Sequence, residues 1–271
     1  MCGAVLLGGS ELLAQEFSIL FTASANGNYQ NCHCPDVPLG GLDKRAQLIA
    51  SYRDGDPDVL VVDNGDNFVD YLSPGVEGII ITAFDLTDYD VINIGDQDIA
   101  YGPAAYFELS ALIQTHGEAV TIRKGSMTYS VLPILDPDAT RFYPDFIFED
   151  FSLANYEQQI ELWLEEDLPA KTFRVLLSHA GFDADRKLAQ KYPAIDLIIG
   201  GHSQTVLDTL VTVAGVPIVQ AGGNGGYVGE IRFSSGAGEF RVLEHVLHPL
   251  RLELPGHPEM MKRIDQYNRG E

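Results

Sequence analysis

The sequence predicts an α/β protein in which several strands lead to one shared site. Two apolar runs, Val175–Leu177 and Leu197–Ile199, each lead to a histidine with small residues beside it. A buried strand that ends in this way carries an imidazole to the edge of a parallel sheet, where open α/β folds bind their ligands. The interval between the two runs resembles a helix, which is the usual connection between parallel strands. We therefore expect His179 and His202 to lie side by side.

The N-terminal part of the chain alternates strands and helices. The run at 17–23 is apolar and β-branched and meets a Gly turn, which predicts a first strand. Residues 40–57 predict a helix, because Leu42 and Ile49 share an apolar face and a Gly/Asp/Pro cluster follows. The run VLVV at 59–62 predicts a buried strand that ends in carboxylates and Gly.

The middle of the chain continues this alternation. Helical patterns cover 77–90, 104–116 and 152–167, and the last of these is acidic and contains Trp163. Residues 90–102 repeat the strand-to-Gly pattern. Side chains alternate from Val120 to Leu135, which predicts antiparallel edge strands.

The last part of the chain reads as strands. Residues 215–233 predict a hairpin, and its GGNGG turn at 222–226 lacks the following helix that a phosphate-binding loop requires. Residues 240–252 predict a final strand that closes the sheet.

One device recurs at the strand ends, where Gly stands next to Ser, Asp or His. It occurs near 24–28, 63–67, 95–98, 178–181 and 200–204. Strand ends that all carry such side chains predict an α/β sandwich with one converging site and argue against a Rossmann dinucleotide fold.

Composition excludes some partners. The chain has 271 residues and a formal charge of −22, from 39 acidic and 17 basic residues. Long-range repulsion therefore disfavours nucleic acid and anionic membrane surfaces. No apolar run approaches the roughly 18–20 residues of a membrane span.

The N-terminus predicts export. Residues 1–15 resemble a truncated secretory signal, although no basic segment precedes the apolar run and Glu11 interrupts it. The expected location is therefore the periplasm or the outside of the cell. Residues 16–271 are then expected to form a single domain.

Two cysteines stand close together in the sequence NCHCP. Cys32 and Cys34 are compatible with a strained disulfide, a redox pair or metal ligation together with His33. They are also compatible with surface thiols that have no chemistry.

Four motifs together resemble those of a known family. GDNF (65–68), IGDQDIAYG (94–102), LSHAG (177–181) and GGHSQ (200–204) have the order and approximate spacing of the calcineurin-like metallophosphoesterases. The chain is most similar to the catalytic domain of secreted 5′-nucleotidases, from about residue 17 to 250. This resemblance implies a four-layer α-β-β-α sandwich with a two-metal centre. It also implies that the C-terminal nucleotide-specificity domain of that branch is absent.

The resemblance assigns one half of the metal centre. Asp66 matches the bridging Asp, and Asp96 stands where the family usually has Asn. His179 and His202 match the imidazole ligands of the same metal. Oxygen and imidazole ligands suit Zn²⁺, Mn²⁺ or Fe²⁺, and we expect one divalent ion.

The other half departs from the family. Ser24 and Asn26 replace its Asp-x-His motif, and Gln204 replaces the second His of its His-x-His motif. Gln97 replaces the His that serves the leaving group, while Asp98, which would orient that His, is retained. Gln97, Asp98 and Asn26 are therefore the candidates for catalytic contacts, and loss of one such contributor commonly costs about 10²–10³ in rate.

Three functions remain open at this point. The first is a metal-dependent phosphoester hydrolase that acts on a small phosphorylated molecule. The second is a repurposed domain that uses Cys32 and Cys34 for thiol redox chemistry with a partner protein. It is similar to a divergent nucleotidase-like branch, some of whose members are selenoproteins. The third is a pseudoenzyme that binds a ligand or partner in the old cleft.

Overall fold

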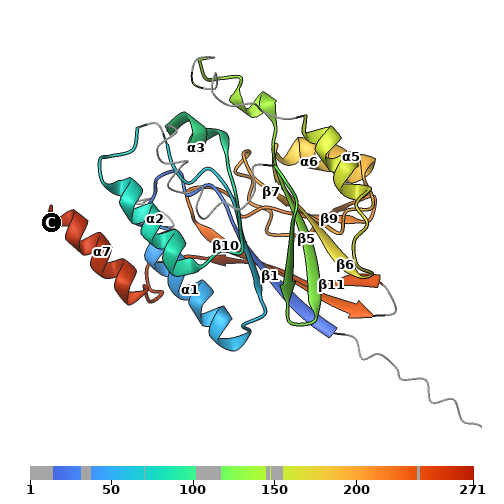
Figure 1. Ribbon diagram of the computed structural model, residues 1–271. Coiled ribbons are helices and arrows are strands. Elements are labelled where there is room, and N and C mark those ends of the chain that lie inside the picture. Colours follow the sequence, from blue (N-terminus) through green and yellow to red (C-terminus); the bar gives the residue numbers. More distant parts are fainter. Residues whose placement is uncertain are drawn as a thin grey trace, which may run out of the picture.

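Two β-sheets lie face to face, and helices cover the outer face of each (Figure 1). The computed structural model describes residues 15–31, 38–69, 71–101, 117–144, 147, 155–236 and 239–271. Within these residues the predicted α-β-β-α sandwich is confirmed.

The first sheet has five strands in the order β11-β10-β1-β2-β3. They are β1 (Gln15–Thr22), β2 (Leu60–Asn64), β3 (Val91–Asn93), β10 (Tyr227–Gly236) and β11 (Glu239–Pro249). β1, β2 and β3 are parallel, whereas β10 is antiparallel to both β1 and β11.

The second sheet has six strands in the order β4-β5-β6-β7-β9-β8. They are β4 (Val120–Lys124), β5 (Met127–Leu135), β6 (Thr172–His179), β7 (Leu197–Gly200), β8 (Val211–Val213) and β9 (Val216–Val219). β5, β6, β7 and β9 are parallel, so their carboxyl ends share one edge.

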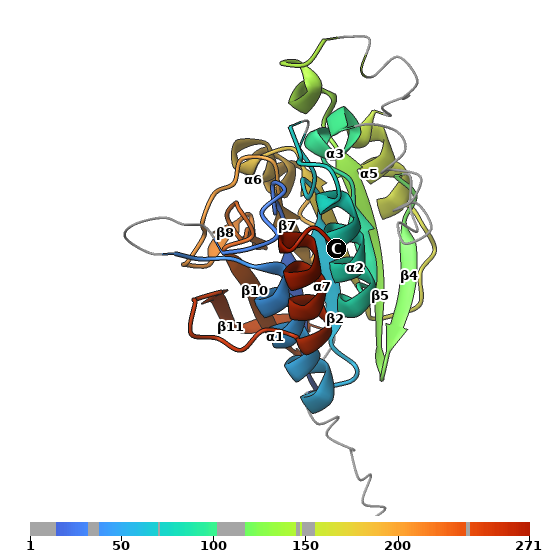
Figure 2. The same cartoon turned by 90° about the vertical axis from the view of Figure 1, so that its left-hand side faces the viewer.

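The helices form the two outer layers. The first sheet is covered by α1 (Leu42–Gly55), α2 (Val76–Thr87) and α7 (Pro258–Asn268), which pack against one another (Figure 2). The second sheet is covered by α5 (Tyr156–Leu164) and α6 (Phe182–Lys191). The short helix α3 (Asp96–Tyr101) follows β3, and a 3₁₀ turn, η1 (Pro137–Thr140), follows β5. Among the described residues, no helix has the length and apolarity needed to cross a membrane.

The main core lies between the sheets. On β1, Phe17, Ile19 and Phe21 point into this core, while Leu20 points the other way and packs with Ile49 of α1. The period of two along a strand produces this division. The second sheet contributes Tyr129, Val131, Phe173, Val175, Leu177, Leu197, Ile199 and Val219.

The predicted hairpin at 215–233 is wrong. β9 pairs with β7 and β8 in the second sheet, whereas β10 pairs with β1 and β11 in the first. The Gly-rich segment at 222–226 therefore crosses from one sheet to the other. The apolar pattern of the two strands is the same in either arrangement, because both strands are buried.

Other predictions are confirmed in part. Residues 120–135 do form antiparallel strands, but only β4 lies at the edge, since β5 also pairs with β6. The helix predicted at 152–167 is shorter, as α5 spans Tyr156–Leu164. The helix predicted at 104–116 lies outside the described residues. β11 does close the first sheet as an edge strand.

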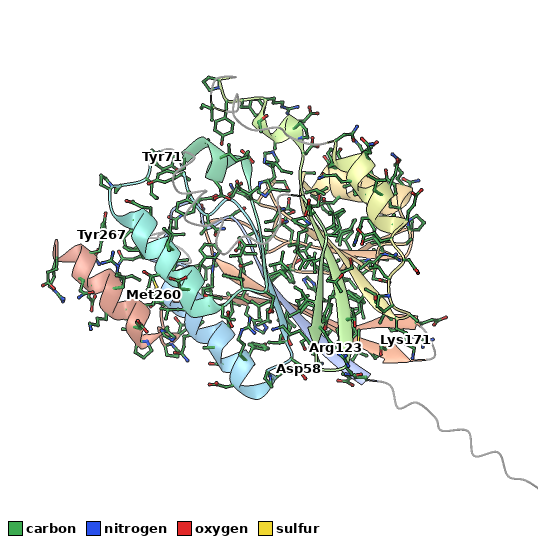
Figure 3. The ribbon with its side chains drawn as sticks, viewed as in Figure 1. Asp58, Tyr71, Arg123, Lys171, Met260 and Tyr267 are labelled. Atoms are coloured by element: carbon green, nitrogen blue, oxygen red, sulfur yellow. The ribbon has the colours of Figure 1, made fainter. Side chains whose placement is uncertain are left out.

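Helix α7 was not predicted. Its signal was present, because Pro258 stands in the first turn and Met260 and Ile264 are buried one turn apart. Met260 packs against the α2 layer, and Tyr267 lies farther along the same helix (Figure 3).

Two buried asparagines tie the sheets together at their carboxyl edge. Asn93 Nδ2 lies 2.8 Å from Asn64 Oδ1, 3.0 Å from the carbonyl oxygen of Ile134 and 3.1 Å from that of Leu177. Asn64 Nδ2 in turn donates to the carbonyl oxygens of Ser178 and Ile199, at 3.0 and 2.9 Å. The two amides thereby join the ends of β2 and β3 to those of β5, β6 and β7.

Substitution Asn93→Ala should destabilise the fold. It leaves buried carbonyl oxygens without a donor, which costs about 2–3 kcal/mol in the free energy of unfolding. Urea denaturation measures this change. Asn268→Ala is the matched control, because Asn268 is exposed and its side chain accepts one hydrogen bond, from Tyr29 Oη, within the part of the chain that the structure describes. Equal stability of the two variants would contradict a structural role for Asn93.

Candidate metal centre

Four residues meet where the carboxyl edges of the two sheets come together. Asp66 follows β2, Asp96 begins α3 after β3, His179 ends β6, and His202 follows β7. One ligand atom from each lies within 4.8 Å of the others. The two imidazole rings are 5.6 Å apart, as expected from the sequence. Tyr71 lies at this end of the sandwich (Figure 3).

His179 is the centre of this cluster. Its Nε2 lies 3.2 Å from both Asp66 Oδ2 and Asp96 Oδ1. His202 Nδ1 lies 2.9 Å from the same Asp96 oxygen. The side chains of Asp66, Asp96 and His179 are buried, whereas that of His202 is 31% exposed. The cluster therefore reaches solvent through His202.

The tautomer of His179 follows from its second contact. Nδ1 lies 2.7 Å from the backbone carbonyl oxygen of Asn64. A carbonyl oxygen only accepts, so Nδ1 carries the hydrogen. The lone pair of a neutral Nε2 then faces two carboxylate oxygens, which is unfavourable without positive charge between them.

The electrostatics of the cluster agree with this geometry. Burial opposes a charge on His179, but the Asp66 and Asp96 carboxylates outweigh it and raise the pKa of the imidazole well above its usual range. Burial likewise opposes charge on Asp96, yet hydrogen bonds from His179 and His202 lower the pKa of its carboxyl. The site is built for a cation, either a proton or a metal ion. Two carboxylates and two imidazoles are a donor set that fits Zn²⁺, Mn²⁺ or Fe²⁺.

Close backbone contacts fix the position of the His179 ring. Gly95 lies against the ring and the Asp66 carboxylate, and a side chain there would displace both. Gly201 lies against the ring on the Nδ1 side. These glycines are required for the close approach of backbone to imidazole.

The turns around the site hold left-handed backbone at residues other than glycine. Positive φ angles occur at Ser24 (49°), Asn26 (50°), Asp66 (59°), His202 (62°) and Gln204 (52°). Each costs roughly 1–2 kcal/mol for an L-residue, and such strain concentrates at functional sites. Ser24, Asn26 and Gln204 thus share the left-handed backbone of the candidate ligands Asp66 and His202.

Comparisons with known proteins agree with this architecture. No protein-family model matches the chain. Its sequence is 26% identical to human 5′-nucleotidase over 234 residues, which cover 72% of this chain and 41% of that protein. Its structure matches the sulfate thiohydrolase SoxB of Thermus thermophilus with a TM-score of 0.79, at 16% identity over 94% of this chain and 60% of that one. It also matches the calcineurin-like phosphoesterase YfkN of Bacillus subtilis with a TM-score of 0.75, at 17% identity over 95% and 98% of the two chains.

The chain has the fold of a calcineurin-like phosphoesterase and is similar in sequence to 5′-nucleotidases. It spans about two fifths of the length of the human relative, since it covers 41% of that protein.

Asp98 lies next to the site and organises the backbone around it. Its buried carboxylate accepts hydrogen bonds from four backbone N–H groups. These belong to Asp66 and Gly95, at 2.7 and 2.8 Å from Oδ2, and to Asn67 and Phe68, at 2.7 and 2.9 Å from Oδ1. With both oxygens turned to the backbone, Asp98 fixes the turn that carries Asp66.

Gln97, Asn26 and Asn224 form a network of neutral amides beside Asp66. Gln97 lies between Asp66 and Asn26, and Asn26 Nδ2 donates to Asn224 Oδ1 at 3.0 Å. Ser24 is fully buried, and its hydroxyl has no hydrogen-bond partner within the described part of the chain. The side chain of Gln204 lies against Gly223.

Sequence reasoning missed Gln220, which holds the loop of His202. This buried side chain donates from Nε2 to the carbonyl oxygen of Gly201 at 3.0 Å. Its Oε1 accepts from Ser203 Oγ at 3.1 Å. The side-chain amide of Gln220 thus forms hydrogen bonds to the residues on both sides of His202. Gln220 directly follows the apolar strand β9, and this position at a strand end was its local signal. Asn64 was also missed, although a polar residue at the end of the VLVV strand was a usable signal.

Cys32 and Cys34 lie outside the described residues, as does the signal-like segment up to residue 14. The structure therefore does not place the predicted thiol pair relative to the metal centre.

Asp185 is a second buried carboxylate near the site. It lies in the first turn of α6, fully buried, with its Oδ2 against Gly200. Neither of its oxygens has a hydrogen-bond partner among the described residues. Burial raises the pKa of this carboxyl to about 7, although the Ser178 hydroxyl and the charge of His179 act in the opposite direction.

Asp185 should make the stability of the domain fall as pH rises. The unfolded carboxyl ionises near pH 4, whereas the folded one stays protonated up to about pH 7. Stability contributed by the protonated form is therefore lost between these values. The substitution Asp185→Asn changes the free energy of unfolding at each pH. We expect this change to be more stabilising at pH 8 than at pH 5 by about 2–4 kcal/mol.

Urea denaturation at both pH values measures this difference. Asp183→Asn, an exposed change in the same helical turn, should shift both values equally. A pH dependence of Asp185→Asn as flat as that of the control would contradict a protonated Asp185.

Proposed function

We propose that the domain binds one divalent ion through Asp66, Asp96, His179 and His202 and hydrolyses phosphoesters of small molecules. One observation carries the proposal. His179 Nδ1 donates to the Asn64 carbonyl, so Nε2 faces two carboxylates and a cation is needed among them.

The chemistry of the bound ion would be that of a Lewis acid, since such an ion polarises phosphoryl oxygens and lowers the pKa of a bound water. The chain's own residues orient the site. Asn64 and the two glycines hold His179, Asp98 holds the turn of Asp66, and Gln220 holds the loop of His202. Solvent and substrate reach the cluster on the His202 side, because His202 is its most exposed member.

The ion also resolves a charge problem. A net charge of −22 repels an anionic substrate at long range. A divalent ion inverts the local field at the place where the phosphoryl group binds.

Turnover should be modest. Gln97 stands where the family has a histidine, and a carboxamide neither donates nor takes up a proton at neutral pH. Small phosphomonoesters, nucleotides among them, are the proposed substrates, since the curated relatives are named 5′-nucleotidases. We further propose that the protein is exported to the periplasm or secreted.

A second function is a redox domain in which Cys32 and Cys34 act on a partner protein. It is favoured by the neutral residues at positions 24, 26, 97 and 204, which remove ligands and the proton donor from the hydrolytic site. Alkylation of the thiols separates the two. If the first function is right, alkylation leaves phosphoester hydrolysis unchanged. If the second is right, alkylation abolishes thiol exchange with the partner protein. A domain that only binds a ligand would show neither activity.

Substitution His202→Ala should release the metal. Loss of a residue that only hydrogen-bonds to a metal ligand weakens metal affinity by up to about 100-fold. Removal of one of the four ligands themselves should therefore weaken the affinity for Mn²⁺ by at least about 100-fold. Metal analysis after dialysis should fall from one ion per chain to near none, and hydrolysis of nucleoside monophosphates and a chromogenic phosphomonoester with added Mn²⁺ should fall with it.

His257→Ala serves as the control, because His257 is the N-cap residue of α7, a helix of the layer outside the first sheet. Unchanged metal content in His202→Ala would contradict the one-ion centre. If the unaltered protein binds the ion but does not hydrolyse phosphoesters, the metal site stands and the proposed hydrolysis is contradicted.

A further inference from the structure

Gln97 joins two oxygen atoms that face each other in the half of the site where the family's ligands are replaced. Its Nε2 lies 3.1 Å from Asp66 Oδ2 and 3.2 Å from Asn26 Oδ1. A carboxamide nitrogen carries two hydrogens, so it donates to both oxygens at once. The backbone N–H of Gln97 also donates to Asp66 Oδ1, at 3.1 Å. Gln97 therefore contacts both oxygens of the Asp66 carboxylate.

The second oxygen of this bridge is fixed in place. The backbone N–H of Asn26 donates to the carbonyl oxygen of Asp66 at 2.9 Å, which joins the two loops. Asn26 Nδ2 donates to Asn224 Oδ1, and Asn28 Nδ2 reaches the same oxygen at 3.3 Å. Because the nitrogen of the Asn26 amide is turned to Asn224, its oxygen is turned to Gln97.

A bridge between two oxygens is the position a cation would take. A metal ion between Asp66 and Asn26 would attract both oxygens, and the amide nitrogen of Gln97 already does so with two hydrogens. Ser24 and Gln204, which precede Asn26 and follow His202, are neutral, so neither of them adds an anionic ligand. An ion entering here would have to displace a donor that satisfies two buried or half-buried acceptors.

We propose that Gln97 takes the place of a second cation and thereby limits this centre to one ion. The inference rests on the proposed one-ion site on the other side of Asp66. It assigns Gln97 a role in metal stoichiometry, and its test is therefore the number of ions bound, independent of any activity.

Two isosteric substitutions distinguish the effect of losing the Gln97 amide donor from the effect of adding a negative charge. Gln97→Glu removes the bridging donor and adds one negative charge. Asn26→Asp adds the same charge at the other end of the bridge but keeps the donor of Gln97. Equilibrium dialysis against Mn²⁺, followed by metal analysis, should give one ion per chain for the unaltered protein, two for Gln97→Glu and one for Asn26→Asp. Electron paramagnetic resonance should show coupled Mn²⁺ ions only in Gln97→Glu.

Each outcome decides one statement. One ion in Gln97→Glu would overturn the inference, and two ions in Asn26→Asp would overturn it as well, because charge alone would then set the number. No ion in the unaltered protein would instead overturn the proposed function. Gln190→Glu, an exposed change on α6, controls for net charge and should hold one ion.

Thermal unfolding checks that each variant is folded. If Gln97→Glu does not fold, Gln97→Ala replaces it. Without the donor, that variant should bind more than one Mn²⁺ at saturation, and a single ion would overturn the inference.

Discussion

The site depends on the buried amide pair of Asn64 and Asn93. Dispersion and hydrophobic burial hold the two sheets together but have no strong directional preference. Hydrogen bonds do have one. The Asn64–Asn93 pair fixes the carboxyl ends of five strands relative to one another. Asn64 also selects the tautomer of His179, so the same residue that joins the sheets orients the imidazole.

Energetically unfavourable features are concentrated at this edge. Buried carboxylates, five left-handed residues and a buried hydroxyl without a partner among the described residues lie within a few residues of the cluster. The apolar core between the sheets, where Phe17, Phe173 and Phe233 pack ring against ring, compensates for them. Natural proteins depart from local rules mainly at functional sites, and the distribution here follows that pattern.

Strand-end patterns were sufficient for an α/β sandwich with one converging site, whereas the four layers and the set of four ligand residues came from the resemblance to metallophosphoesterases. Runs such as VLVV and LIIG mark buried strands, and the polar residues after them are brought together because parallel strands end at one edge. The patterns failed where two arrangements bury the same side chains. Residues 215–233 are apolar on both sides of a Gly-rich segment whether they pair with each other or with strands of different sheets.

Long-range supporting contacts were also beyond the sequence. Gln220 acts on the His202 loop through hydrogen bonds that only the packing of β9 beside β7 creates. The apolar run before it places this glutamine at a strand end but does not show which loop it contacts. Gln97 was identified as a departure from a motif, but its bridging position required coordinates.

The unequal burial of the cluster has a kinetic consequence. Asp66, Asp96 and His179 are enclosed by backbone, and His202 alone among the four is substantially open to water. A bound ion would exchange with the medium by first losing its contact to His202. The residence time of the ion, and its accessibility to a chelator, would then be governed by the stiffness of one short loop.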